Sequence, residues 1–307
     1  MNGQLAGPDD SPWNAPPLAT SPGSHKPRQS SVGLLVAVLV AAPVFAGIAY
    51  SALGASGLTG PGADGISLRH FQNVLGDSAT WRSLLWTVWI AAASTSIATL
   101  FAMLTATVFR GRRGGDRVAR LVSVVPLPVP HVVAALCALL VLSQSGLIAR
   151  LAFAADIHAF PADMPALTLD RYGVGLIMAL IWKEFPFLAL IAFSVVARRS
   201  AVLEETARSL GAGARQAFRV ATLPILWRGL LPSMIAVFTF VAGNYEVAAM
   251  LGPSDPLALP LLTMERYTDS ALSVRGEAFV LVLLAMAVSL GGVGVHEWVA
   301  NKVEATD

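Results

Sequence analysis

Few side chains in this sequence are arranged as the reactive groups of enzymes are. The five histidines are scattered, with no His-Glu-x-x-His pair, and a single cysteine offers no Cys pair to hold a metal. None of the three lysines stands in the Gly-Lys-Ser/Thr of a phosphate-binding loop, and no Gly-x-Ser-x-Gly elbow is present. We therefore expect no catalytic residue, no metal site and no bound cofactor on this chain.

One pair of charged side chains stands inside a long apolar run. Lys183 and Glu184 lie near the middle of the run at about 173–197. A charge inside a membrane costs about 2.5–3.5 kcal/mol on insertion scales and usually faces a cavity or a partner. Pro186 removes a helical hydrogen bond to the Trp182 carbonyl, which is then free to accept from a donor such as Lys183.

The next apolar run carries Asn244 and Glu246, which we expect to be the partners of Lys183 and Glu184. Because adjacent helical residues point about 100° apart, Lys183 and Glu184 cannot share one face. Two interpretations stay open. In the first, these four groups line a path for a solute, and in the second they form an ion pair between helices.

A short polar segment, about residues 200–224, separates these two apolar runs. Its apolar side chains keep helical spacing, at Leu203, Ala207, Leu210, Ala214, Ala217 or Phe218, and Ala221. We predict two short amphipathic helices that are separated at Gly211, where glycine allows a turn or a close backbone approach. The second should end at Leu223-Pro224, with Pro224 as the first residue of the next membrane helix. On periodicity alone, the segment binds either a partner protein or an anionic lipid surface.

The composition that surrounds these groups is typical of a membrane protein. Of 307 residues, 55% are hydrophobic and only 13% are charged, whereas soluble domains have about 25% charged residues. A membrane-spanning helix needs about 20 mostly apolar residues, and six segments qualify. They are about 32–53, 83–109, 121–143, 173–197, 225–250 and 278–299. We therefore predict an all-α membrane protein with six transmembrane helices, forming one domain over residues 32–300.

Two of these spans contain features that concern packing. The second has a stripe of small residues that permits close helix approach, at Ser94, Ala98, Ala102 and Ala106. The third contains Pro126, Pro128 and Pro130, which should bend or break its first half. Irregular backbone at membrane depth must face protein or water, so we expect the third span to be an inner helix.

The loops alternate in charge. Arginines exceed acidic residues between the second and third spans and between the fourth and fifth, whereas the loops near 144–172 and 251–277 are mixed. Lys and Arg accumulate on the cytoplasmic side, so both arginine-rich loops and both termini should be cytoplasmic. Residues 1–31 are predicted as a disordered tail, because they contain almost no apolar run, and 301–307 as a C-terminal tail. A net charge of +2 gives no sign of a nucleic-acid partner.

The spacing in the polar segment resembles the EAA loop of binding-protein-dependent ABC importer permeases. That motif reads Glu-Ala-Ala, three residues, Gly, nine residues and Ile-x-Leu-Pro. Here Glu205-Thr206-Ala207 is followed after three residues by Gly211 and, after nine more, by Ala221-Thr222-Leu223-Pro224. Thr206 and Ala221 depart from it. Gly146-Leu147-Ile148, Ile181 to Phe187 and Tyr245-Glu246-Val247 are also similar to this family, most of all to its permeases for polyamines, thiamine and ferric iron.

This resemblance covers most of residues 32–300 and implies the type I importer fold in a bacterial plasma (inner) membrane. Two permeases, identical or homologous, would enclose the path of a small-molecule solute. A cytoplasmic ABC ATPase dimer would bind ATP and Mg, and an extracytoplasmic substrate-binding protein would deliver the solute. The residues implied to couple to the ATPase are Glu205, Ala207, Leu210, Gly211, Ala212, Leu223 and Pro224. The alternative is an ion-gradient-driven secondary transporter or channel, in which the intramembrane charges would be the coupling site.

Overall fold

The structure is a computed structural model that describes residues 31–61, 63, 65–109, 114–157, 163–197 and 201–304. These residues divide into two compact units, within Met1–Gly47 and Ile48–Asp307. The predicted disordered tail lies outside the described residues as far as residue 30, and helix α1 already begins at Ser31. At the other end helix α13 continues to Glu304, so the C-terminal tail predicted from residue 301 begins later than expected.

Six helical segments are long and apolar enough to span a membrane. They are Gly33–Ala55, Ser78–Val108, His131–Ala154, Val174–Val195, Ala214–Ala242 and Leu272–Val295. The described residues form helices joined by turns and contain no strand. The predicted fold class, an all-α protein with six membrane-spanning helices, is therefore confirmed. Helix α1 (Ser31–Ala55) provides the first span.

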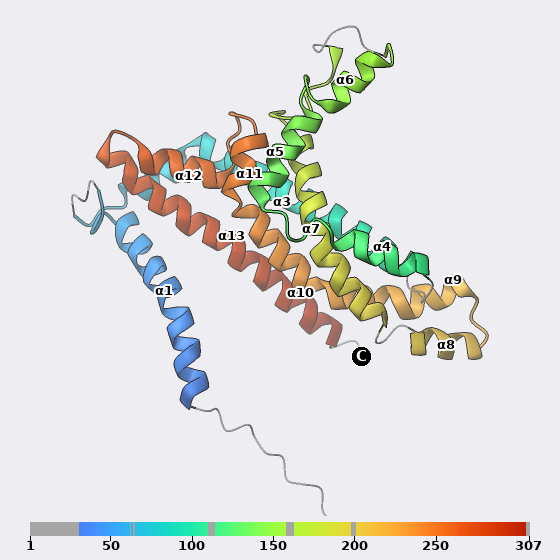
Figure 1. The fold of residues 1–307 in the computed structure, drawn as a ribbon. Helices are drawn as coiled ribbons and strands as arrows, with labels where there is room; N and C mark the ends of the chain where they lie inside the picture. Colours follow the sequence, from blue (N-terminus) through green and yellow to red (C-terminus); the bar gives the residue numbers. More distant parts are fainter. Residues whose placement is uncertain are drawn as a thin grey trace, which may run out of the picture. The chain divides into compact units, whose positions relative to one another are not determined.

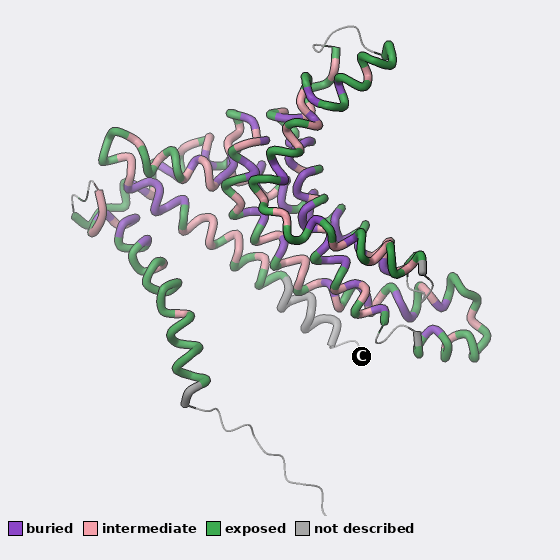
Figure 2. Tube along the Cα trace, viewed as in Figure 1, coloured by how far each residue is buried: buried purple, intermediate pink, exposed green. Residues whose placement is uncertain are grey.

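The second unit is built around three long helices that pack against each other: α3 (Ser78–Val108), α7 (Val174–Val195) and α10 (Leu223–Ala242). Helix α13 (Leu272–Glu304) lies along α10 (Figure 1). Buried residues gather where α3, α7 and α10 meet (Figure 2). The stripe of small residues in α3 is fully buried there, at Ser94, Ala98, Ala102 and Ala106. Small side chains let the helices approach closely, so the predicted packing role of this stripe is confirmed.

Two spans lie about ten residues away from their predicted ranges, the third at His131–Ala154 and the fifth at Ala214–Ala242. The span expected at 121–143 consists of α4 (Gly114–Val124), a turn that contains the three prolines, and α5 (His131–Leu142), with α6 (Leu147–Ala154) following. Proline lacks the N–H that a helix needs, so the predicted break at this point is confirmed.

The span expected at 225–250 is also divided. Helix α10 ends at Ala242, and the short helix α11 (Tyr245–Leu251) begins after Asn244. The side-chain oxygen of Asn244 accepts a hydrogen bond from the Val247 N–H at 2.9 Å. Asparagine is a favoured N-cap because it pairs a free N–H of the first turn, so the residue predicted as a charge partner starts a new helix instead.

The ends of the helices nearest α2 (Arg69–Gly76) are held by a small polar cluster. Arg266 of α12 (Leu259–Thr268) forms ion pairs with Asp77 at 2.8 Å and Glu277 at 3.3 Å. Glu277 also accepts from the Asn73 amide at 2.9 Å. Because Asp77 caps α3 and Glu277 lies in α13, the cluster joins four helices at this end of the bundle.

Candidate functional site

The polar segment forms a helical hairpin beyond the end of α7. Its first arm is α8 (Ala201–Ser209), and its second begins with α9 (Ala214–Ala217). Figure 1 shows this hairpin at the end of α7 opposite to α6. The sequence therefore correctly predicted two short helices that are separated near Gly211.

Gly211 makes the turn of the hairpin. Its φ is +91°, in the left-handed region that favours glycine. The Gly211 N–H donates to the Arg208 carbonyl at 2.9 Å, and the Ala212 N–H donates to the Ala207 carbonyl at 3.0 Å. This pair of bonds is the Schellman motif, which ends α8. No atom of the described chain lies within 4 Å of a Cβ built on Gly211, so the glycine is required here for its backbone conformation.

The second arm does not end at Leu223-Pro224 as predicted. Helix α9 continues through a π-helical turn, η3 (Phe218–Thr222), directly into α10. Pro224 stands in the first turn of α10, directly after the π-helical turn. The result is one helical rod over residues Ala214–Ala242, which connects the hairpin to the core of the bundle.

The predicted coupling residues occupy different parts of this hairpin. Glu205 is exposed on α8, and Leu210 is 84% exposed beside the turn. Ala207 and Ala212 are half-buried, and Leu223 and Pro224 lie at the base of the second arm. The apolar stripe is divided, since Leu203 and Leu210 are exposed whereas Ala217 and Ala221 are buried. The hairpin thus presents exposed apolar side chains together with a carboxylate to its surroundings.

Glu204 is a site residue that the sequence reasoning missed. Its side chain is buried, and its Oε1 accepts a hydrogen bond from the Thr222 hydroxyl, which joins α8 to η3. Its other oxygen lies 3.9 Å from the Arg208 guanidinium. Glu204 precedes Ala207 by three residues, so both share a face of α8, and this spacing was the available signal. Its neighbour Glu205, the first residue of the EAA-like motif, is exposed.

Loss of the Thr222 hydroxyl should loosen the hairpin. In Thr222→Val the buried Glu204 carboxylate loses a donor, which costs about 1–3 kcal/mol for a buried group. We expect faster hydrogen exchange over residues 201–222, measured by mass spectrometry. The control is Thr206→Val, because Thr206 is exposed and, among the described residues, its hydroxyl bonds only to the Val202 carbonyl in the same helix. Equal exchange rates in the two variants would show that Glu204 does not hold the arms together.

The intramembrane charges hold the break in span three. The Lys183 ammonium donates to the carbonyls of Pro126 at 3.2 Å and Leu127 at 3.1 Å. These carbonyls lie in the proline-containing turn between α4 and α5, where the helical bonds are interrupted. Lys183 is buried in α7. The dipoles of the two carbonyls that accept its hydrogen bonds neutralise part of its charge. We expected the Trp182 carbonyl to be the acceptor, and the structure corrects that expectation.

Glu184 holds the other side of the same break. Its Oε1 lies 3.0 Å from Nε2 of His131, the first residue of α5, and both Glu184 and Lys183 are buried. The His131 ring packs on Phe240 of α10, with the ring centroids 5.0 Å apart. Lys183 and Glu184, which are adjacent in α7, therefore bond to the two ends of the turn. Phe240 of α10 packs against His131 at one of these ends.

Asn244 and Glu246 are not the partners of this pair. Asn244 caps α11, and Glu246 is exposed in the first turn of that helix. The predicted contact among the four residues is therefore wrong in its partners, although an interhelix contact of Glu184 exists with His131. The sequence did not indicate His131 as a partner, because it stands 53 residues before Glu184 in the chain.

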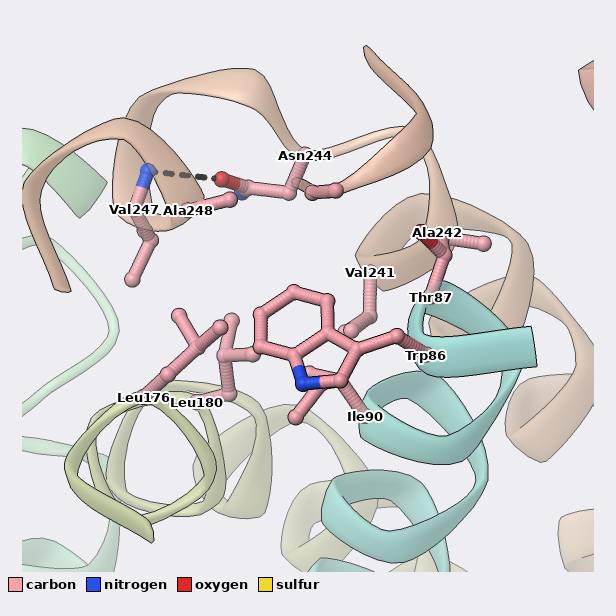
Figure 3. Close-up of a pocket in the computed structure, with 11 residues that line it drawn as sticks. Trp86, Thr87, Ile90, Leu176, Leu180, Val241, Ala242, Asn244, Val247 and Ala248 are labelled. Atoms are coloured by element: carbon pink, nitrogen blue, oxygen red, sulfur yellow. Dashed lines mark hydrogen bonds between the residues drawn. The ribbon is translucent and has the colours of Figure 1, made fainter. Parts of the chain in front are cut away.

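A small cavity lies between α3, α7 and the start of α11 (Figure 3). Its volume is about 10 Å³, and Trp86, Leu176, Leu180 and Asn244 are among the residues that line it. This is room for about one water molecule, whereas ligand pockets measure about 300–1,000 Å³. Among the described residues, no three His, Cys, Asp or Glu side chains come close enough to hold a metal ion.

Comparison with known proteins decides the family. Residues 98–305 match the family described as binding-protein-dependent transport system inner membrane component. The chain belongs to this family. It is accordingly a multi-pass protein of the inner membrane and a transport component rather than an enzyme, as the sequence predicted.

The relatives agree with this assignment. The inner membrane ABC transporter permease protein YnjC of Escherichia coli is 28% identical over 72% of this chain and 41% of its own length. A probable molybdenum ABC transporter permease protein of Haloferax volcanii is 27% identical over 68% of this chain and 73% of its own length. The alignment therefore covers about two fifths of the first relative and most of the second.

A solved structure confirms the fold. The chain superposes with a TM-score of 0.65 on a chain from the crystal structure of a bacterial alginate ABC transporter in complex with an alginate pentasaccharide-bound periplasmic protein. The sequences are 14% identical, and the superposition covers 88% of this chain and 94% of the other. At this identity the likeness shows the permease fold alone.

Proposed function

We propose that this chain is the permease subunit of an ABC importer that takes its driving force from a separate cytoplasmic ATPase through the hairpin α8–α9. Family membership supports the transport role, and the exposed hairpin, whose two arms are joined by Glu204 and Thr222, is the observation that carries the coupling. The comparisons give no support to a secondary transporter driven by an ion gradient. The chain lacks a phosphate-binding lysine motif, so ATP and Mg would bind to the partner.

The hairpin is built to transmit force. Leu210 and Glu205 would dock into a cleft of the ATPase, where the apolar side chain is buried and the carboxylate meets a basic group. Closure of the ATPase dimer would displace α8, which is tied to the second arm by Glu204 and Thr222. The second arm is one rod of 29 residues, about 43 Å long, that enters the bundle as α10. Movement at the surface would therefore tilt the fifth span.

The orientation and further partners follow from this role. The hairpin and both termini would be cytoplasmic, in agreement with the arginines of the loops. A second permease, identical or homologous, would complete the translocation path, and a substrate-binding protein on the opposite side would deliver a small-molecule solute. Lys183 and Glu184 would have a structural role, since their bonds go to span three.

Copurification tests the coupling surface. The tagged chain, coexpressed with its candidate ATPase, should retain that ATPase after detergent extraction. Glu205→Lys should reduce the retained amount about tenfold, as expected for loss and reversal of a charge in an interface. Glu246→Lys is the control, because it makes the same change at an exposed residue of α11. Full retention in Glu205→Lys would place the ATPase elsewhere.

A further inference from the structure

A second pocket, of about 450 Å³, lies beside the first turns of α3, away from the hairpin and from the break in span three. Two arginines, two aromatic residues, a leucine and an aspartate form the part of its lining that matters here: Arg82, Arg171, Trp89, Tyr172, Leu85 and Asp255. Nothing in the proposed coupling mechanism uses these residues.

The turn that carries Arg171 and Tyr172 is held firmly against α3. The Trp86 indole N–H donates to the Arg171 carbonyl at 2.9 Å, and the Trp89 indole N–H donates to the Tyr172 carbonyl at 3.1 Å. The Asp170 carboxylate accepts from the backbone of Tyr172 at 3.0 Å and of Val174 at 2.8 Å. The wall of the pocket is therefore preorganised, and a ligand that binds there orders little of the protein.

The pocket lies at the level of the lipid headgroups. Helix α7 has 22 residues and is about 33 Å long, close to the roughly 30 Å thickness of the hydrocarbon core. Arg171 and Tyr172 come just before its first residue, so they sit at the membrane–water boundary. Trp89 and Tyr172 are 53% and 73% exposed, and such aromatic side chains concentrate at this boundary.

The pocket also has an unbalanced positive charge. It contains two guanidinium groups and one carboxylate. Arg82 lies 3.5 Å from Asp255, but both side chains are more than half exposed, and such pairs contribute little. Within the described part of the chain, the Arg171 guanidinium has neither a hydrogen bond nor an ion pair. One net positive charge is therefore available to a ligand.

We infer that this pocket binds the phosphate of an anionic phospholipid. The planar guanidinium groups of Arg82 and Arg171 match the geometry of phosphate oxygens. Leu85, which is 68% exposed, and Trp89 lie on α3 next to them and would contact the glycerol and the upper acyl chains. The exposed apolar lining favours a lipid over an acidic protein surface, because acyl chains would cover this lining and acidic side chains would not.

Fluorescence quenching in vesicles tests this site. The purified full chain is reconstituted in phosphatidylcholine vesicles that contain either brominated phosphatidylglycerol or the same fraction of brominated phosphatidylcholine. We expect the anionic lipid to quench the indole fluorescence preferentially, and Trp89→Phe to remove most of that preference. Because each arginine near the surface favours an anionic lipid about fivefold, Arg171→Gln should lower the preference by that factor, and Arg82→Gln/Arg171→Gln should abolish it.

Arg150→Gln provides the matched control. Arg150 is exposed on α6 and donates only to the Ser145 carbonyl in the described structure, so its loss should leave the preference unchanged. An equal decrease of the anionic-lipid preference in Arg150→Gln would contradict a specific site, because it would show that general surface charge attracts the lipid. A preference that survives Arg82→Gln/Arg171→Gln would overturn the assignment, because the anionic lipid would then bind without these two arginines. Its abolition by excess inorganic phosphate would indicate a site for free anions instead.

Discussion

Replacement of Glu184 by leucine should severely reduce the amount of assembled protein. The substitution removes the hydrogen-bond partner of His131, the first residue of α5, at the break before span three. Loss of a hydrogen-bond partner in the interior costs about 1–3 kcal/mol. We expect a much lower yield of monodisperse protein on size-exclusion chromatography and a lower melting temperature in detergent.

Glu246→Leu is the matched control, because it makes the same change at an exposed residue. It should assemble normally. The experiment also separates the two interpretations of the intramembrane charges. Normal assembly of Glu184→Leu with altered solute selectivity would assign Glu184 to the solute path and contradict the structural role.

Replacement of Gly211 by valine should uncouple transport. A β-branched residue at a φ of +91° is strained by about 1–3 kcal/mol, so the turn of the hairpin would open and displace Leu210 and Glu205. Solute uptake should fall about tenfold or more, since each 1.4 kcal/mol changes a population tenfold. The protein should still fold, because no described atom surrounds the glycine.

Gly213→Ala is the control for this experiment. Gly213 lies two residues further along the same hairpin, but its φ is −65°, which any residue adopts. A Cβ there meets no atom of the described residues within 4 Å. Uptake should therefore remain close to that of the unaltered chain. Equal and normal uptake in both variants would show that the turn does not transmit force.

The sequence predicted the spans and the hairpin well, because their signals are local. Apolar length decides whether a helix crosses a membrane, and Gly211 marks the turn through its backbone conformation alone. The proline-containing break was predictable for the same reason. Pro126 and its neighbours remove hydrogen bonds in whatever surroundings they have.

The contacts between distant residues were not predictable. Lys183 bonds to carbonyls 56 and 57 residues earlier in the chain, and such acceptors have no sequence signature. Asn244 was read as a charge partner because it neighbours Glu246, whereas it starts a helix. The joining of α9 to α10 through η3 was missed, since Pro224 is equally compatible with a new helix or with an early turn of a longer one.

These contacts fit together in a permease. Lys183 and Glu184 hold the proline-containing turn before α5 against α7. The Pro126 and Leu127 carbonyls, which lack helical partners there, are thereby paired. In the proposed mechanism, the rod that begins at Ala214 would tilt relative to this part. A rigid support beside a movable rod is what a transporter needs if force enters at one surface only.

Solute uptake by the reconstituted complex tests the energy source most directly. Proteoliposomes that contain the chain with its ATPase, second permease and substrate-binding protein are given either internal ATP or a proton or sodium gradient. Uptake should require ATP and should stop when the ATPase is omitted. Uptake driven by the gradient without any ATPase would contradict the account.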